Sequence, residues 1–157
     1  MRRRFSWSVL AMAVGCAAIL AATEKPSRDF QDLMKSNGSI VDISLGSERA
    51  STGTVGSAPP SLKTHIRAKD YDGIAQDAAT LKANFTKVTT FWTERNIDDA
   101  ATISRAAVKA ADELETAARA KDDTRIATAA NAVAATCREC HQSHRVMQLT
   151  NRTFEIM

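Results

Sequence analysis

Near its C-terminus the chain reads Cys137-Arg138-Glu139-Cys140-His141, two cysteines three residues apart followed directly by a histidine. Because residues i, i+3 and i+4 share one face of a helix, both thiols and the imidazole are presented on the same side. This spacing is the attachment signature of a c-type haem, in which the thiols bond to the porphyrin and the histidine binds its iron. Neither Arg138 nor Glu139 is needed for that role.

Three other interpretations of this stretch are weaker. A structural zinc site normally has four ligands, and the only other cysteine and histidines are Cys16, His65 and His144. A thioredoxin-type redox pair is expected in a βαβ context, and no segment of the chain alternates like a strand. A plain disulfide would leave His141 unexplained. The sequence therefore favours one covalent haem c on the two cysteines, with His141 as the proximal iron ligand.

The N-terminus has the pattern of an export signal. Arg2-Arg3-Arg4 precede an apolar run that reaches Ala21 and Ala22, small residues typical of a cleavage site. Residues 1–23 are therefore predicted to be a secretory signal peptide, and the protein to be periplasmic or otherwise exported. Two alternatives stay open, a lipid anchor at Cys16 and an uncleaved membrane anchor. The membrane is a partner only in those two cases.

Cleavage would change the net charge. The full chain carries +3, with 21 basic and 18 acidic residues, and the predicted signal peptide holds three of the arginines. Without these three arginines the mature chain has 18 basic and 18 acidic residues and is neutral. A neutral chain gives no argument for nucleic acid or an anionic membrane surface as a partner. Only two cysteines would remain, both in the haem motif.

The mature chain has the composition of an all-α protein, rich in alanine and poor in aromatic residues. The clearest helix is predicted from Asp70 to Glu94, because its apolar residues step by three and four positions, as in a helix packed in a left-handed bundle. Those residues are Tyr71, Ile74, Ala78, Leu81, Phe85, Val88 and Trp92.

Three more helices are predicted from apolar spacing and capping residues. They run from Arg28 to Leu45 with Ser27 as cap, from Asn96 as cap to about Ala120, and from Asp122 or Asp123 as cap to about Met147. Residues 46–64, rich in Gly, Ser, Thr and Pro, form a long first crossover. Residues 24–147 are thus predicted to form one antiparallel four-helix bundle, with haem near the end of the fourth helix. A tail, residues 148–157, has no assigned role.

Four helices, a long first crossover and a haem motif on the last helix resemble the class II cytochromes c, the cytochrome c-prime and cytochrome c-556 family. The resemblance runs from about Arg28 to Met147 and includes Leu33-Met34-Lys35-Ser36-Asn37-Gly38 in the first helix. In the c-556 branch a stretch of this kind supplies the methionine on the open side of the iron. The resemblance therefore implies Met34 as the distal iron ligand, and the alternative is a methionine that only fills the core.

Other positions near the motif have less specific expectations. Arg145, four residues after the haem histidine as in the family, is assigned by the resemblance to the haem environment, over the proximal imidazole or on a propionate. An ordinary surface arginine is the alternative. The family often has an aromatic residue where this chain has His144, which is expected to be packed or half-exposed near the porphyrin edge. His65 is expected at the surface.

The predicted function is that of an exported monohaem electron carrier with low-spin His/Met iron, which is not an enzyme. Its partners would be redox proteins, whose identity the sequence does not reveal. A five-coordinate protein of the c-prime kind that binds nitric oxide or carbon monoxide is the first alternative. A haem-based sensor or structural interaction domain is the second. Dimers are common among the c-prime relatives, so a homodimer is left open.

Overall fold

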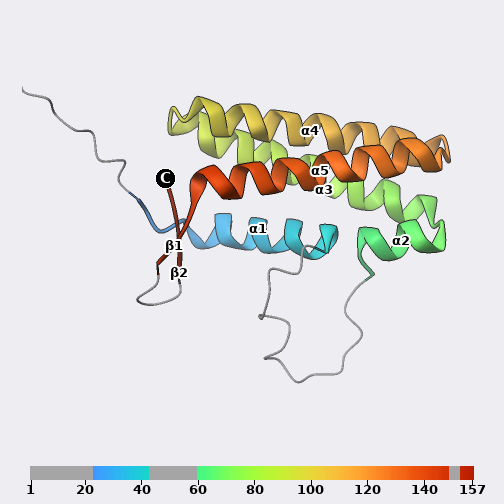
Figure 1. Ribbon diagram of the computed structural model, residues 1–157, viewed down its shortest axis with the longest axis horizontal. Helices are drawn as coiled ribbons and strands as arrows, with labels where there is room; N and C mark the ends of the chain where they lie inside the picture. The colour runs from blue at the N-terminus through green and yellow to red at the C-terminus, as the bar shows by residue number, and fades with distance from the viewer. Residues whose placement is uncertain (1–22, 43–59, 149–152) are drawn as a thin grey trace, which may run out of the picture.

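The computed structural model describes residues 23–42, 60–148 and 153–157, which are predominantly helical (Figure 1). The helices are α1 (Arg28–Val41), α2 (Leu62–Ala68), α3 (Tyr71–Glu94), α4 (Asp98–Arg119) and α5 (Asp123–His144). Two short strands follow them, β1 (Arg145–Gln148) and β2 (Thr153–Ile156). The prediction of a helical chain is confirmed for the body of the molecule, and its C-terminal end departs from it.

The core lies mainly between α3 and α4, with α5 packed on α4. The predicted apolar seam of α3 is buried, except that Tyr71 is half-buried, because a step of three and four residues keeps one face turned inward. Trp92 is the largest fully buried side chain. Helix α4 contributes mostly alanines, which allow close approach of its neighbours: Ala100, Ala101, Ala107, Ala110, Ala111, Ala117 and Ala118.

Capping residues set most helix starts as the sequence indicates. Side-chain oxygens of Ser27, Asp70 and Asp122 accept hydrogen bonds from backbone N–H groups three residues on, at 3.3, 3.0 and 3.0 Å. The start of α4 differs, because Ile97 is its N-cap and Asn96 has a left-handed backbone with φ of 56°. Asparagine tolerates this conformation better than most residues, so Asn96 turns the chain between α3 and α4 instead of capping.

Helix α1 is shorter than predicted, and α2 was not predicted at all. Helix α1 ends at Val41, because its C-cap Asp42 adopts a left-handed backbone with φ of 55°. Helix α2 begins inside the predicted crossover 46–64. Its first residue, Leu62, is only 3% exposed and joins the core, so burial of an apolar side chain stabilises a seven-residue helix that local pattern does not reveal.

The last helix ends earlier than predicted, and the tail is not without structure. Helix α5 ends at His144 rather than near Met147, and the chain continues directly into β1. Strand β2 pairs antiparallel with β1. The sequence analysis predicted no strands, and this prediction is wrong for the C-terminal end of the chain. Strands of four residues are too short to show alternation, and their burial depends on distant partners.

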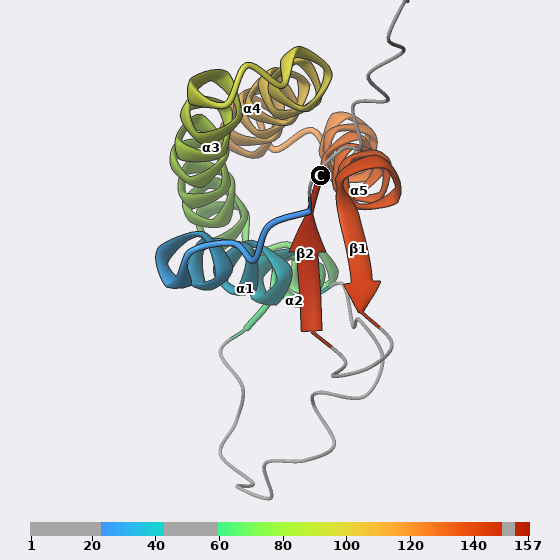
Figure 2. The same ribbon diagram turned by 90° about the vertical axis from the view of Figure 1, so that its left-hand side faces the viewer.

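The four longer helices run in alternating directions, α1 and α4 one way and α3 and α5 the other (Figure 1). Seen end-on, the hairpin lies between α5 and α1 (Figure 2). Helix α1 packs on α3 and α2. The end of the molecule that carries the hairpin therefore gathers the start of α1, the end of α3, the start of α4 and the end of α5.

Some predictions concern residues outside the described ranges. The predicted signal peptide, residues 1–23, lies there apart from Thr23, and so do Cys16 and most of the crossover 46–64. None of the described helices is long and apolar enough to cross a membrane.

Candidate functional site

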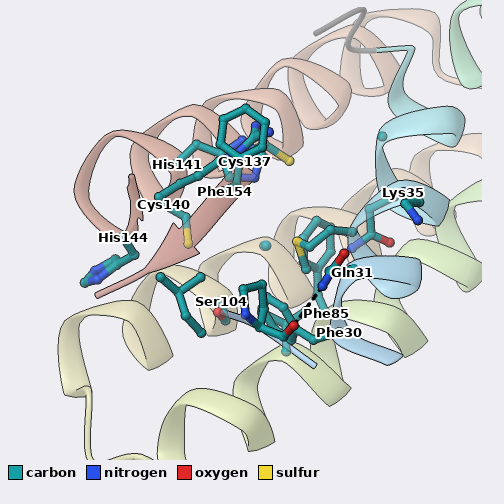
Figure 3. A pocket seen from close by; sticks show the side chains of 18 of the residues that line it. Phe30, Gln31, Lys35, Phe85, Ser104, Cys137, Cys140, His141, His144 and Phe154 are labelled. Atoms are coloured by element: carbon teal, nitrogen blue, oxygen red, sulfur yellow. Dashed lines mark hydrogen bonds between the residues drawn. The ribbon is translucent and has the colours of Figure 1, made fainter. Parts of the chain in front are cut away.

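A cavity of about 630 Å³ lies where the start of α1 meets the end of α5, and residues of α3, α4 and the hairpin also line it (Figure 3). Cofactor and ligand sites in proteins typically enclose roughly 300–1,000 Å³. The five residues that the sequence singles out as a site all line this cavity: Met34, Cys137, Cys140, His141 and Arg145. The fold thus brings the first helix and the last together at one place.

Cys137 and Cys140 form part of the α5 wall, and both are free thiols with half-buried side chains. Burial raises the pKa of Cys137 to about 11, and burial, aided by Cys137 itself, raises the pKa of Cys140 to about 11. A thioredoxin-type dithiol has instead a lowered pKa at its reactive cysteine. The two sulfurs are therefore neutral S–H groups beside an apolar cavity.

His141 directly follows the second cysteine and lies on the same wall (Figure 3). Burial lowers the pKa of its imidazole, and the positive charge of nearby Arg145 lowers it further. A neutral imidazole keeps one ring nitrogen with a free lone pair, the form in which histidine binds a metal.

The α1 wall carries Met34, which is half-buried and packs against the core. Gly38 follows one turn later and lines the same cavity. A Cβ atom at Gly38 would meet no neighbour within 4 Å, so protein packing does not require glycine there. Glycine inside a helix costs about 0.5–1 kcal/mol relative to alanine. The glycine at position 38 leaves the cavity open at this point of the α1 wall, one turn from Met34.

The inner wall of the cavity is apolar. It is formed mainly by Phe30, Phe85, Val88, Trp92 and Ala107.

Unpaired polar atoms gather around the same cavity. Among the described residues, three buried side-chain atoms have no hydrogen-bond partner: Asn37 Nδ2, Trp92 Nε1 and His144 Nε2. All three residues line the cavity. The Oδ1 atom of Asn37 accepts a hydrogen bond from Asn84 Nδ2 at 2.8 Å, which fixes the orientation of its amide. Buried polar atoms without hydrogen-bond partners are rare in folded proteins, and these three belong to residues of the cavity wall.

The hairpin adds lining residues that the sequence analysis missed. Phe154 of β2 lines the cavity, and the guanidinium carbon of Arg145 lies 3.3 Å from the centroid of its ring. Arg145 therefore belongs to the cavity and not to the open surface. No local signal in the sequence indicates Phe154, because its position depends on the pairing of β2 with β1.

His144 is packed, which was one of its two expected states. It is 7% exposed, its ring centroid lies 5.4 Å from that of Trp92, and its Nδ1 donates to the carbonyl oxygen of Met157 at 3.1 Å. Its Nε2 lies 3.3 Å from an oxygen of Asp99 in an orientation that is not a hydrogen bond. His144 thus ties the C-terminus to the core at the edge of the site.

His65 was expected at the surface, but its side chain lies against α3. Its side chain is 15% exposed, and its Nδ1 lies 2.8 Å from Oδ2 of Asp77 on α3. It is not among the lining residues of the cavity. The unpredicted helix α2 places it there, so His65 docks α2 on α3.

The chemistry of this cavity fits a covalently attached haem. Two neutral thiols and a neutral imidazole lie on one wall, a thioether lies on α1, and the inner wall is apolar. In the described part of the chain, no three side chains of His, Cys, Asp or Glu gather as a site for a bare metal ion.

Comparison with known proteins adds no assignment to this chemistry. No family model matches the chain, and neither a curated protein nor a solved structure is significantly similar to it.

Proposed function

We propose that the protein is an exported, monohaem c-type cytochrome that carries single electrons and catalyses no reaction of its own. The observation that supports this most directly is the convergence of Cys137, Cys140, His141 and Met34 on one apolar cavity of cofactor size. The first three come from one helix and the fourth from another, far away in the sequence. Each has the side chain that a c-type haem with histidine and methionine ligands requires.

Cys137 and Cys140 would hold the cofactor covalently. Each S–H group would add across one vinyl double bond of the porphyrin, with the sulfur bonding to one carbon and the proton to the other. This addition would need no oxidant, because the atoms and electrons of the thiol and the double bond are all kept in the thioether. The resulting thioethers hold the porphyrin in both oxidation states of its iron.

His141 and Met34 would bind the iron, His141 from the α5 side of the cavity and Met34 from the α1 side. Haem supplies the one-electron couple of its iron when it is bound. The neutral thioether of Met34 favours the ferrous form and so raises the potential. The apolar residues of the inner wall exclude water, which also favours the form with less charge.

The alternating directions of α1, α3, α4 and α5 support a class II cytochrome c fold, an antiparallel four-helix bundle with a long first crossover. In this proposal haem is attached near the end of the fourth bundle helix, α5. The predicted signal peptide supports a periplasmic or otherwise exported protein. Its partners would be other redox proteins, which reach the cofactor through the open side of the cavity.

The absorption spectra of the purified holoprotein, oxidised and reduced, test the ligand assignment. We expect a low-spin spectrum with a thioether-to-iron charge-transfer band near the red edge, which Met34→Ala abolishes. Met147→Ala is the matched control, because Met147 is 52% exposed and is not among the residues that line the cavity. A high-spin spectrum that Met34→Ala leaves unchanged, with ready binding of carbon monoxide to the reduced form, would instead support a gas-binding protein of the c-prime kind.

A further inference from the structure

Strand β2 of the C-terminal hairpin lies along the cavity, and all four of its residues line it. In the β1–β2 pair, Arg145 lies opposite Ile156 and Met147 lies opposite Phe154. Side chains of opposite residues, and of every second residue along a strand, point to the same side of the pair. Arg145, Phe154 and Ile156 of this face line the cavity and Met147 does not, and Thr153 and Glu155 of the other face line it as well.

The base of the hairpin is fixed to the rest of the molecule. Ile156 is 7% exposed and exchanges two backbone hydrogen bonds with Glu24, each 2.9 Å long. The N–H of Met157 donates to the carbonyl oxygen of His144 at 3.3 Å, and the His144 side chain donates back to the Met157 carbonyl at 3.1 Å. The hairpin therefore cannot swing away from the cavity without losing both sets of contacts.

Phe154 is connected to the haem histidine through Arg145. The Arg145 guanidinium lies on the Phe154 ring, with its carbon 3.3 Å from the ring centroid, which is a cation–π contact. Arg145 begins β1 four residues after His141, both residues line the cavity, and the charge of Arg145 acts on the His141 imidazole. Figure 3 shows Phe154, Cys137 and His141 among the residues that line the cavity.

We infer that the hairpin is a fixed wall of the haem cavity, in which Phe154 holds the Arg145 guanidinium beside His141. Phe154 is then a positioning residue that tunes the reduction potential through Arg145. A positive charge near the iron favours the ferrous over the ferric form, because the ferrous form carries one positive charge less. This inference rests on the proposed attachment of haem at His141.

A double-mutant cycle on the holoprotein tests the inference. The reduction potential is measured for wild type, Phe154→Leu, Arg145→Gln and the double variant. Phe154→Leu keeps an apolar side chain of similar size but has no ring to hold the guanidinium. Phe154→Tyr restores a ring, and Met147→Leu is the matched control on the same hairpin face. The mass of each denatured protein reports haem attachment, and far-UV circular dichroism reports folding.

We expect Phe154→Leu and Arg145→Gln each to lower the potential, and Phe154→Leu to lower it no further once Arg145 is replaced. Phe154→Tyr and Met147→Leu should leave the wild-type potential unchanged. The inference is wrong if Phe154→Leu has no effect on a folded holoprotein, or if its effect is the same in the Arg145→Gln background. A wild-type protein without covalent haem would overturn the proposed function itself and the inference with it, and the mass measurement distinguishes this outcome.

Discussion

Substitution of Gly73 tests how tightly α2 is docked on α3. A Cβ atom at Gly73 would lie 2.5 Å from Asp70 Oδ2 and 2.8 Å from His65 Cγ. The Asp70 side chain caps α3 by accepting the Gly73 N–H at 3.0 Å, and the His65 ring is held by Asp77 at 2.8 Å. Both side chains must shift to admit the methyl group, and each shift strains the hydrogen bond that the side chain makes.

The expected magnitude follows from opposing effects. Alanine in place of glycine favours the helix by about 0.5–1 kcal/mol. Overpacking typically costs about 1–3 kcal/mol, and a weakened N-cap about 0.5–2 kcal/mol. Gly73→Ala should therefore lower the free energy of unfolding by about 0.5–4.5 kcal/mol, because the helix gain offsets only part of the two costs.

Urea denaturation followed by far-UV circular dichroism measures this change as a lower midpoint with an unchanged slope. The same substitution in a His65→Ala background is the control, since one of the two crowded neighbours is then gone and the loss should shrink. If Gly73→Ala were as stable as wild type, or if the loss did not depend on His65, the docking of α2 described above would be wrong.

Three further predictions concern buried polar groups and the cavity. Asn84→Ala should lower the free energy of unfolding by about 1–3 kcal/mol, because the buried Asn37 Oδ1 loses its donor; urea denaturation measures it. Burial raises the pKa of Asp77, because the folded state favours the protonated carboxyl group. The stability that this preference contributes is complete below the unfolded-state pKa of Asp77 and is lost as pH rises through its folded-state pKa. Asp77→Asn should therefore gain stability relative to wild type as the pH of the denaturation assay rises from acidic values. Gly38→Leu should fill the space beside Met34 and raise the high-spin fraction in the absorption spectrum.

Local pattern was enough to predict the helices that dominate the fold. The apolar seam of α3, from Tyr71 to Trp92, has a period that only a helix can bury on one side, and the structure buries it. Ser27 and Asp122 cap their helices as predicted, because short polar side chains reach the free N–H groups of the first turn, and Asp70, predicted only as the start of its helix, caps α3 in the same way. The sequence also placed Met34 and the Cys137–His141 motif on separate helices, whose meeting at one cavity followed from the fold.

What the sequence did not reveal depends on contacts between distant residues. Strand β2 exists through its pairing with β1 and with Glu24, and nothing local to Thr153–Ile156 indicates that partner. Phe154 entered the site by that route. Helix α2 is short and becomes stable by burying Leu62, and this is why His65 was expected at the surface and lies against Asp77 instead.

Covalent attachment of haem is the central claim, and it is tested most directly on protein exported by a bacterium that matures c-type cytochromes. The purified protein is denatured and extracted with acidified organic solvent, and the mass and haem absorption of the remaining polypeptide are recorded. We predict that the wild-type polypeptide retains one haem and that the Cys137→Ala/Cys140→Ala double variant retains none. A wild-type polypeptide that carries no haem, or that loses all of it on extraction, would contradict the proposal.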